Sequence, residues 1–393
     1  MSGGIAADDL AARLAGLEGI GETPEGIVRL AWTPEDAACR AWFAAQARAL
    51  GRTAEADPAG NLWAPPPDAP APWWGAGSHL DSVRGGGRFD GPLGVAAAFA
   101  IAERATVPVA VLCLADEEGA RYNTPTFGSR ALVGRLDAAE AVARTDDRGI
   151  ALGDALRAAG VDPDGLARAP EWLARLRGFL ELHIDQTREL ATAGRAAGAV
   201  SGLAARLRLQ VDVDGQADHA GTTPPAERRD AMSAAARLIV AAENAAGRGG
   251  AIRVTASRIL VAPNALTTIA GHVRLWLDAR AAGLAAVDGW LDAVRGEAAA
   301  IAARTRTEIA IHVASRSAGT PFDPRVRAAL GGGDELLSFA GHDAGVLAER
   351  IPAGMVFVRN PTGISHAPAE AVDLGDAAAG ATAMLRALEE LAA

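Results

Sequence analysis

The chain has 393 residues, of which 50% are hydrophobic and 22% are charged, and its formal net charge is −10. At about 100–200 residues per domain this length predicts two or three domains, and the hydrophobic fraction excludes a disordered chain. The negative charge and the lack of a basic cluster argue against nucleic acid as a partner. No run of about 18 uncharged apolar residues indicates a membrane span, and the N-terminus carries no export signal, so we expect a cytoplasmic protein without a membrane partner. Two cysteines are too few for a disulfide framework or a multi-thiolate zinc site.

The first third of the chain predicts an α/β domain. Residues 33–50 carry an N-cap threonine, a first-turn proline and an acidic first turn, which are typical of a helix. Residues 61–72 are rich in proline and are expected to form a loop. Two short apolar runs, residues 73–80 and 107–116, enclose the apolar segment 95–104. The order strand, helix, strand at this spacing indicates a βαβ unit on a largely parallel sheet.

The middle of the chain has a different pattern. Stretches of alternating apolar and polar residues, typical of half-buried strands, enclose two helical stretches. Together they describe an α+β unit of four strands and two helices, with the helices on one face of the sheet. We therefore expect a discontinuous α/β domain of residues 1–203 and 315–393, interrupted by an inserted α+β domain of residues 204–314. The strands are expected at 204–214, 251–260, 269–279 and 309–314, and the helices at about 225–247 and 282–304.

The densest group of polar residues follows the first apolar run. His79 ends that run and Asp81 comes two residues later, which is the pattern of a metal ligand held by a neighbouring carboxylate. The glycines at 85–87 let the backbone fold back, so that Asp90 can reach the same centre. For His79 alone, an incidental histidine in a solvated loop is the simpler interpretation.

Three carboxylates, Asp116, Glu117 and Glu118, follow the second apolar run. Carboxylates at the end of a buried strand are costly unless cations or protons neutralise them. The two adjacent glutamates could take different roles, one as a metal ligand and the other as a base that acts on an activated water. An acidic turn without function is the alternative. His183 also ends an apolar run, and His366 lies in a loop defined by glycine and proline.

These residues make a set of nitrogen and oxygen donors without a thiolate. The set is too large for one tetrahedral zinc ion, but it serves two metal ions if Asp90 bridges them. Imidazole with carboxylate suits Zn, Mn, Co or Ni, and the residue types do not choose among these metals. The five candidate ligands are His79, Asp90, Glu118, His183 and His366.

Six segments in this order resemble the hydantoinase/carbamoylase family of dinuclear-metal amidases, which belongs to a clan of metal-dependent aminoacylases and carboxypeptidases. The resemblance covers the chain from about Ala31 to Glu370, and it implies two divalent metal ions per chain. It also implies that residues 1–203 and 315–393 form the catalytic domain, and that residues 204–314 form a lid and dimerisation domain through which two chains make a homodimer. The segments are GSHLDSVRGGGRFDGPLGV, DEEGARY with FGSRAL, ELHIDQ, HAGTTPPAERRDA, GHDA and GISHAPAE.

The resemblance also implies roles for the individual residues around the metal ions. His79 and His183 would be terminal ligands of one ion, Glu118 and His366 of the other, and Asp90 the bridge. Glu117 would be the general base, and Asp81 would orient His79. The peptidases of the clan generally have a carboxylate where this chain has His183, which favours an amidase over a peptidase.

For substrate binding, the resemblance implies that Gln186 and Gly341 contact the substrate and that Arg280 holds its carboxylate. His219 would polarise the scissile carbonyl, usually in the active site of the partner subunit. Thr267 stands where the family has a substrate-binding asparagine. Two further departures are Thr187-Arg188 in place of Gly-Pro, and Phe339 where glycine is common.

We expect the protein to hydrolyse a small carboxylated ureido or N-carbamoyl compound, such as an N-carbamoyl amino acid or allantoate. The bond that it cleaves is the C–N bond of a linear amide that is not a peptide. One alternative is an N-acyl amino acid or dipeptide hydrolase of the same clan. Another is a small-molecule binding protein that has lost turnover. Retention of Glu117 and of all five candidate ligands counts against the binding protein.

Overall fold

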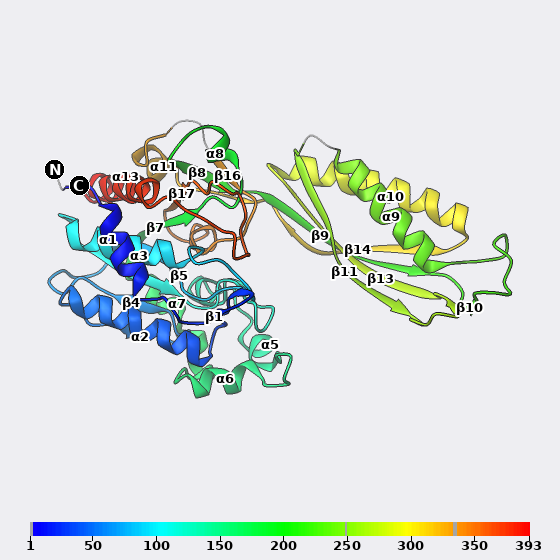
Figure 1. Cartoon of the computed structure of the whole chain (residues 1–393), viewed down its shortest axis with the longest axis horizontal. Helices are drawn as coiled ribbons and strands as arrows, with labels where there is room; N and C mark the ends of the chain where they lie inside the picture. Colours follow the sequence, from blue (N-terminus) through cyan, green and yellow to red (C-terminus); the bar gives the residue numbers. More distant parts are fainter. Residues whose placement is uncertain (1–2, 248–249, 333–335) are drawn as a thin grey trace. The chain divides into compact units, whose positions relative to one another are not determined.

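The structure is a computed structural model that describes residues 3–247, 250–332 and 336–393, and it divides into two units (Figure 1). Unit 1 combines Met1–Leu203 with Pro321–Ala393, and unit 2 is Ala204–Thr320. Among the described residues, no helix combines the length and the hydropathy that crossing a membrane requires.

Unit 1 is built on a mixed sheet with the strand order β15-β8-β17-β7-β5-β6-β4-β3, and β16 pairs with β8. The four central strands β17, β7, β5 and β6 are parallel to one another, whereas β8 pairs antiparallel with β17 and β4 pairs antiparallel with β6. The predicted mixed, largely parallel sheet is therefore confirmed. The strands are β3 (Glu55–Ala56), β4 (Leu62–Ala64), β5 (Trp73–His79), β6 (Val109–Leu114), β7 (Leu176–Ile184), β8 (Ala197–Leu203), β15 (Thr320–Pro321), β16 (Leu336–Ser338) and β17 (Ala353–Val358), with a separate hairpin of β1 (Glu22–Thr23) and β2 (Gly26–Ile27).

Hydrophobic cores cover both faces of this sheet. In β6, Val109, Val111 and Cys113 belong to a core shared with α1, α2, α3 and α13, whereas the intervening residues belong to a second core with α4, α7 and α12. Such a strand is buried on both faces, as its unbroken apolar run predicted. The helices of unit 1 are α1 (Ala7–Ala15), α2 (Pro34–Ala49), α3 (Pro92–Arg104), α4 (Phe127–Leu132), α5 (Ala138–Ala143), α6 (Leu152–Ala158), the 3₁₀ helix η1 (Pro163–Arg168), α7 (Pro170–Leu173), α8 (Glu189–Thr192), α11 (Pro324–Ala329), α12 (Asp343–Leu347) and α13 (Leu374–Ala392).

Two local predictions have different outcomes. The helix predicted after Thr33 is confirmed as α2, because the Thr33 side chain accepts a hydrogen bond from the backbone N–H of Asp36. The loop predicted at residues 61–72 is wrong in its first part, because Leu62–Ala64 form β4 between β3 and β6. The Trp63 side chain is buried and its indole donates a hydrogen bond to Asp57, and the prolines begin only after this strand.

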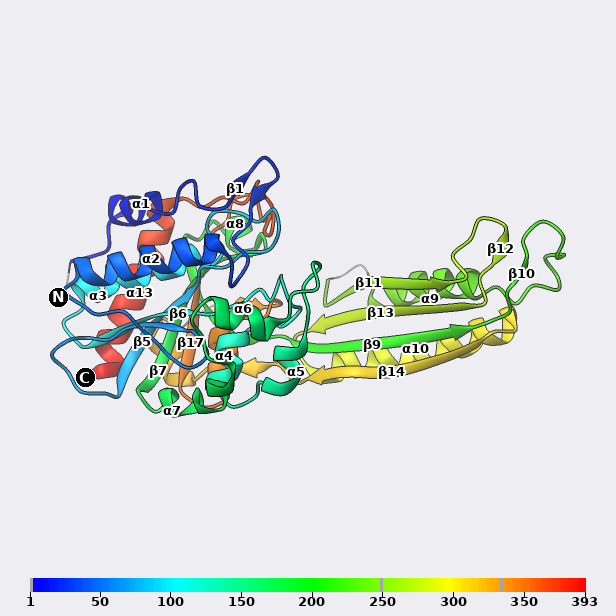
Figure 2. The same ribbon diagram turned by 90° about the horizontal axis from the view of Figure 1, so that it is seen from below.

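Unit 2 contains an antiparallel sheet with the order β11-β13-β9-β14, and α9 and α10 cover one of its faces (Figure 2). Alternate residues of β9 and β13 are buried against these helices, and the residues between them form the open face. A short pair, β10 with β12, lies at the end of the sheet where β9 ends. The elements are β9 (Ala205–Asp214), β10 (Asp218–His219), α9 (Ala231–Ala246), β11 (Ile252–Ala262), β12 (Thr268–Ile269), β13 (His272–Ala281), α10 (Leu284–Thr305) and β14 (Glu308–Ser317).

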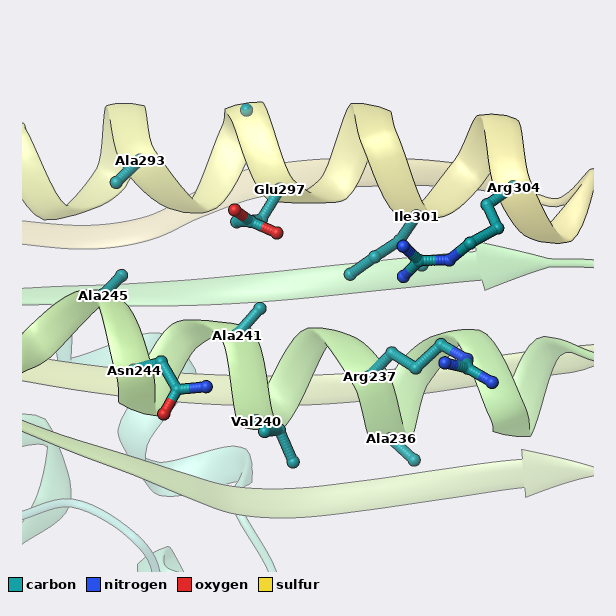
Figure 3. A pocket seen from close by; sticks show the side chains of 11 residues that line it. Ala236, Arg237, Val240, Ala241, Asn244, Ala245, Ala293, Glu297, Ile301 and Arg304 are labelled. Carbon is teal, nitrogen blue, oxygen red and sulfur yellow. The ribbon is translucent and has the colours of Figure 1, made fainter.

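The first helix of unit 2 begins later than the predicted residue 225. Asp230 caps α9 by accepting a hydrogen bond from the backbone N–H of Ser233. The segment before it is held as a loop by the guanidinium of Arg228, which donates to the carbonyl oxygens of Ala220 and Thr223. A groove of about 820 Å³ lies between α9 and α10, with Val240 and Ile301 among its lining residues (Figure 3).

Candidate metal centre

Three neighbouring parallel strands deliver the candidate site residues of unit 1 to one edge of the sheet. His79 is the last residue of β5 and His183 lies at the end of β7, whereas Glu117 and Glu118 follow β6. Because the carboxyl ends of parallel strands meet at one edge, side chains from different parts of the sequence come together there. Ligand and catalytic sites of open α/β sheets are found at this edge.

Gly91 allows the fourth group, Asp90, to reach the same place. Its φ is +85°, a conformation that favours glycine, and a Cβ at this position would lie 2.5 Å from Cε1 of His79. Pro92 then begins α3. The backbone thus passes directly over the His79 imidazole, which only glycine permits.

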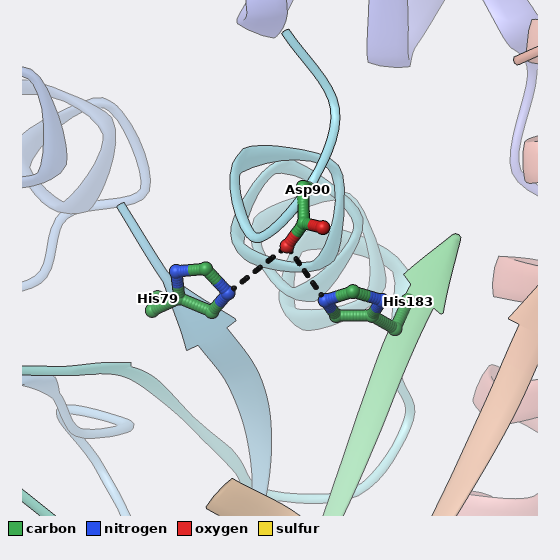
Figure 4. Close-up of side chains that lie close together, drawn as sticks. All are labelled: His79, Asp90 and His183. Carbon is green, nitrogen blue, oxygen red and sulfur yellow. Dashed lines mark ion pairs between the residues drawn. The ribbon is translucent and has the colours of Figure 1, made fainter. Parts of the chain in front are cut away.

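Asp90 lies between two groups of nitrogen and oxygen atoms. Its Oδ1 is 3.4 Å from Nε2 of His79 and 3.1 Å from Nε2 of His183 (Figure 4). Its Oδ2 is 3.6 Å from Nε2 of His366, which is itself 3.3 Å from Oε1 of Glu118. The structure therefore brings the five predicted ligands together, with Asp90 common to both groups.

The spacing and the chemistry of these atoms fit divalent metal ions. Two ligands at about 2.1 Å from a tetrahedral ion are about 3.4 Å apart, close to the separations around Asp90. The buried Nε2 of His79 has no hydrogen-bond partner in the described part of the chain, which costs free energy unless a cation lies beside it. Metal binding by these residues stays a prediction, and the donors that it requires are present.

Backbone carbonyl groups orient the two buried histidines. Nδ1 of His79 is 3.0 Å from the carbonyl oxygen of Asp81, and Nδ1 of His183 is 3.0 Å from that of Ile184. An Nδ1–H that donates to these oxygens leaves Nε2 free to bind a metal ion. The Asp81 carboxylate, predicted to orient His79, lies 3.6 Å from its Nδ1 and accepts hydrogen bonds from the backbone N–H groups of Glu117 and Glu118.

The electrostatics indicate an excess of buried negative charge. Burial raises the pKa of Glu117 well above its ordinary value, and the charges of Glu118 and Asp343 raise it further. Burial, followed by the charge of Asp90, raises the pKa of Glu118 to about 8. Burial opposes the charged form of His183, yet Asp90 raises the pKa of that imidazole to about 9. Protons bound to these groups neutralise negative charge that divalent cations would otherwise neutralise.

Three residues around Asp90 complete the centre. Gln186 and Ser365 each donate a hydrogen bond of 2.9 Å to Oδ2 of Asp90. Oε1 of Glu370 accepts hydrogen bonds from the backbone N–H groups of Phe89 and Asp90, and burial raises the pKa of Glu370 to about 7. Gln186 was predicted to contact substrate, whereas Ser365 and Glu370 were given no role. The one feature of the sequence that could have indicated a role for Ser365 and Glu370 is that both lie close to His366 along the chain.

The His366 loop is strained and clamped. His366 has a φ of +58°, a left-handed conformation that costs a non-glycine residue on the order of 1–3 kcal/mol. The side chain of Asn360 holds the loop, because it accepts from the backbone N–H groups of Thr362 and Gly363 and donates to the carbonyl oxygen of Ile364. His366 is the most exposed candidate ligand, at 46% of its side chain, so the centre opens to solvent there.

A further buried group lies behind His183. The ring of His342 is 4.5 Å from that of His183, and Glu181 completes a third set of candidate ligands. Both oxygens of Glu181 already accept hydrogen bonds, from Ser78 Oγ and the backbone N–H of Ala344, so we interpret this set as support for His183. The predicted substrate contact Gly341 is exposed and directly precedes His342.

The remaining predicted site residues belong to unit 2. His219 and Thr267 lie together, because β10 pairs with β12 and the backbone N–H of Ala220 donates to the carbonyl oxygen of Thr267. Arg280 lies at the opposite end of the sheet, eight residues beyond His272 along β13. At the rise of a β-strand this separates the two ends by about 27 Å.

Comparisons with known proteins show the family of the chain. Residues 75–390 match the model of peptidase family M20/M25/M40. The chain is 35% identical to the N-carbamoyl-L-amino acid amidohydrolase of Geobacillus stearothermophilus, with 97% of each chain covered, and 28% identical to the allantoate amidohydrolase of Escherichia coli, with 96% of each covered. The crystal structure of a hydantoinase/carbamoylase family amidase from Burkholderia ambifaria superposes with a TM-score of 0.84 at 34% identity, covering 99% of this chain and 98% of that one. The chain therefore belongs to peptidase family M20/M25/M40, among its hydantoinase/carbamoylase-type amidases.

Proposed function

We propose that this chain is a metal-dependent amidohydrolase that cleaves a C–N bond of a small carboxylated ureido compound, an N-carbamoyl amino acid or a compound like allantoate. The observation that carries the proposal is the pair of donor groups that share Asp90, with Glu117 beside them. The names of the relatives, which are amidohydrolases of N-carbamoyl amino acids and allantoate, support the substrate class.

His79 and His183 would hold one divalent cation, Glu118 and His366 a second, and Asp90 would contact both. Zinc is the first expectation for these ions, with Mn, Co or Ni as alternatives. When bound, such ions polarise a carbonyl group and acidify a water molecule.

Glu117 would move the proton. Its Oε2 lies 4.0 Å from Nε2 of His79, at the centre but outside both donor groups. Its raised pKa suits a carboxylate that takes a proton from the attacking water and returns it to the leaving nitrogen. With a ureido substrate and one water, the products are an amine, carbon dioxide and ammonia.

The proposal extends to a homodimer. In one copy of unit 2, Arg280 and His219 lie at opposite ends of the sheet, whose strand β13 spans about 27 Å from His272 to Arg280, and this is too far for both residues to contact one small substrate. If Arg280 holds the substrate carboxylate through a bidentate pair, His219 must serve another site, that of the partner subunit. Thr267 lies beside His219 and would accompany it, whereas Gln186 and Gly341 belong to unit 1.

Unit 2 offers surfaces for such a dimer. β11 and β14 are the edge strands of its sheet, and edge strands tend to pair with other chains unless they are protected. Ile259 and Leu260 on β11 are 48% and 47% exposed, which is unusual for adjacent large apolar residues. The groove between α9 and α10 is a second apolar surface of the same unit.

An assay of ammonia release tests the proposed function. The protein is loaded with Zn, Mn, Co or Ni and supplied with N-carbamoyl α- and β-amino acids and allantoate, and N-acetyl amino acids and dipeptides are followed by amine release. Turnover of ureido compounds supports the proposal. Turnover of only the N-acetyl compounds or the dipeptides would contradict the proposal and favour an aminoacylase or a peptidase. Binding of these compounds without turnover would favour a small-molecule binding protein.

A further inference from the structure

The open face of the sheet in unit 2 carries a row of three arginines. Arg253 of β11 is paired with Arg280 of β13, and Arg280 is paired with Arg206 of β9. Directly opposite residues of antiparallel strands share a face, with Cβ atoms about 4.5–5.5 Å apart. Like charges in this position destabilise a sheet, so stability alone does not explain the row.

A carboxylate lies beside this row. Asp278 lies two residues before Arg280 on the same strand and face, and it accepts hydrogen bonds of 2.8 Å from Nε of Arg280 and 2.9 Å from Nη2 of Arg208. Arg208 is the cross-strand partner of Asp278. The cluster of Arg206, Arg208, Arg253, Arg280 and Asp278 therefore has four positive charges and one negative charge.

Arg206 makes no direct contact with the Asp278 carboxylate. Among the residues that the structure describes, its guanidinium has no hydrogen bond and no ion pair, although its side chain is half-buried. Burial lowers the pKa of Arg206 and the charges of Arg208 and Arg280 lower it further, against a smaller opposing effect of the Asp278 charge. An arginine nevertheless stays charged in a protein, so an anion is the partner that this position lacks.

The row lies at the end of the sheet where β9 leaves unit 1. β8 ends at Leu203 and β9 begins at Ala205, so Arg206 lies three residues after the point where the first segment of unit 1 ends. His219 and Thr267 are at the far end of the same sheet. Arg206 is thus a neighbour of the proposed carboxylate-binding Arg280 and is remote from the residues assigned to the partner's site.

We propose that Arg206 binds a second carboxylate of the substrate, beside the one that Arg280 holds, so that the enzyme prefers ureido compounds with two carboxylates. This inference rests on the proposed function, which gives Arg280 its role. Two carboxylates joined by a short carbon chain match two guanidinium groups on adjacent strands. A monocarboxylate would leave Arg206 uncompensated.

The kinetic test compares N-carbamoyl-L-aspartate with N-carbamoyl-L-asparagine, which has nearly the same shape but an amide in place of the second carboxylate. We expect the wild type to prefer the aspartate compound at least tenfold in kcat/KM. Arg206→Gln should reduce this preference at least tenfold, and Arg206→Lys should retain part of it, because a lysine keeps the charge but loses the bidentate geometry. No preference in the wild type, or an equal loss for both substrates in Arg206→Gln, would overturn the inference.

Arg258→Gln is the matched control. Arg258 lies on the same open face of the sheet, opposite Trp276 and 4.8 Å above its ring, and outside the arginine cluster. Its removal changes the net charge of the protein equally, so the wild-type preference should be retained. A loss of preference in Arg258→Gln equal to that in Arg206→Gln would show a general charge effect and overturn the inference.

A binding measurement separates this inference from the proposed function. Calorimetry with succinate and propionate on the metal-loaded protein needs no turnover. Succinate should bind at least tenfold more tightly than propionate, and Arg206→Gln should abolish the difference. If no ureido compound is hydrolysed, the proposed function fails, whereas the succinate result still decides whether Arg206 forms a dicarboxylate site. Equal affinity for the two acids would overturn it.

Discussion

Asp90 shows how far the geometry of a single side chain depends on residues that are not ligands. Gln186 and Ser365 fix its Oδ2 by hydrogen bonds, and Glu370 fixes the backbone on which it stands. Such partners of a metal ligand commonly account for about 10–100-fold in metal affinity. The position of Asp90 between the two donor groups therefore depends on the segments that carry Gln186, Ser365 and Glu370, and so would the binding of metal ions by Asp90.

Glu117 and Glu118 are adjacent, and the proposed function gives them different tasks. Glu117→Gln should keep the metal content but lower kcat by about 10²–10⁴-fold, because the amide cannot take a proton. Glu118→Gln should instead lose metal, since its Oε1 belongs to one of the donor groups. Elemental analysis and steady-state kinetics check both variants. Near-normal turnover in Glu117→Gln together with full metal content in Glu118→Gln would show that the roles are assigned wrongly.

Helix α3 must lie close to the sheet, because Asp90 directly precedes its first turn. Gly94 makes this approach possible, since a Cβ there would collide with the carbonyl oxygen of Leu182. Gly94→Ala should therefore lower the free energy of unfolding by about 1–3 kcal/mol and weaken metal binding. Gly289→Ala is the control, because Gly289 lies in α10 and a Cβ there would meet no atom within 4 Å apart from its own stretch of helix. Alanine should stabilise that helix by about 0.5–1 kcal/mol. Urea unfolding measures both changes, and an unchanged Gly94→Ala protein would contradict the close packing.

The same elements show what the sequence can predict. The apolar runs that became β5 and β6 were long enough to indicate a parallel βαβ unit, whereas the three residues of β4 were hidden beside a proline-rich stretch. Glu370 could not be assigned a role, because its partners Phe89 and Asp90 are about 280 residues away along the chain. Alternation in β9 and β13 indicated which residues share a face. It could not give the register, which places Arg206 opposite Arg280.

For the molecule as a whole, the buried charges of the centre link stability to pH and to metal. Burial raises the pKa of Glu118 and of Asp343 to about 8, and Asp90 raises that of His183 to about 9. A group whose pKa is higher in the folded than in the unfolded protein stabilises the fold fully at pH values below its unfolded-state pKa. This stabilisation is lost as the pH rises through the folded-state pKa. The metal-free protein should thus show a falling Tm between pH 7 and 9, whereas bound cations replace these protons and flatten the dependence. Calorimetry with and without a chelator checks this, and a metal-free Tm that rises over this range would contradict it.

The proposed homodimer predicts that two inactive variants regain activity when their subunits mix. If His219 acts at the partner's centre, an inactive Glu117→Gln chain and an inactive His219→Ala chain complement each other, because their heterodimer contains one centre with both residues intact. Equal mixing should restore about a quarter of wild-type activity, since half of the dimers are mixed and each has one working centre of two. Mixing Glu117→Gln with His79→Ala is the control and should restore nothing, because both changes affect unit 1 of their own chain. Absence of recovery despite demonstrated subunit exchange would mean that His219 serves its own chain or takes no part in catalysis.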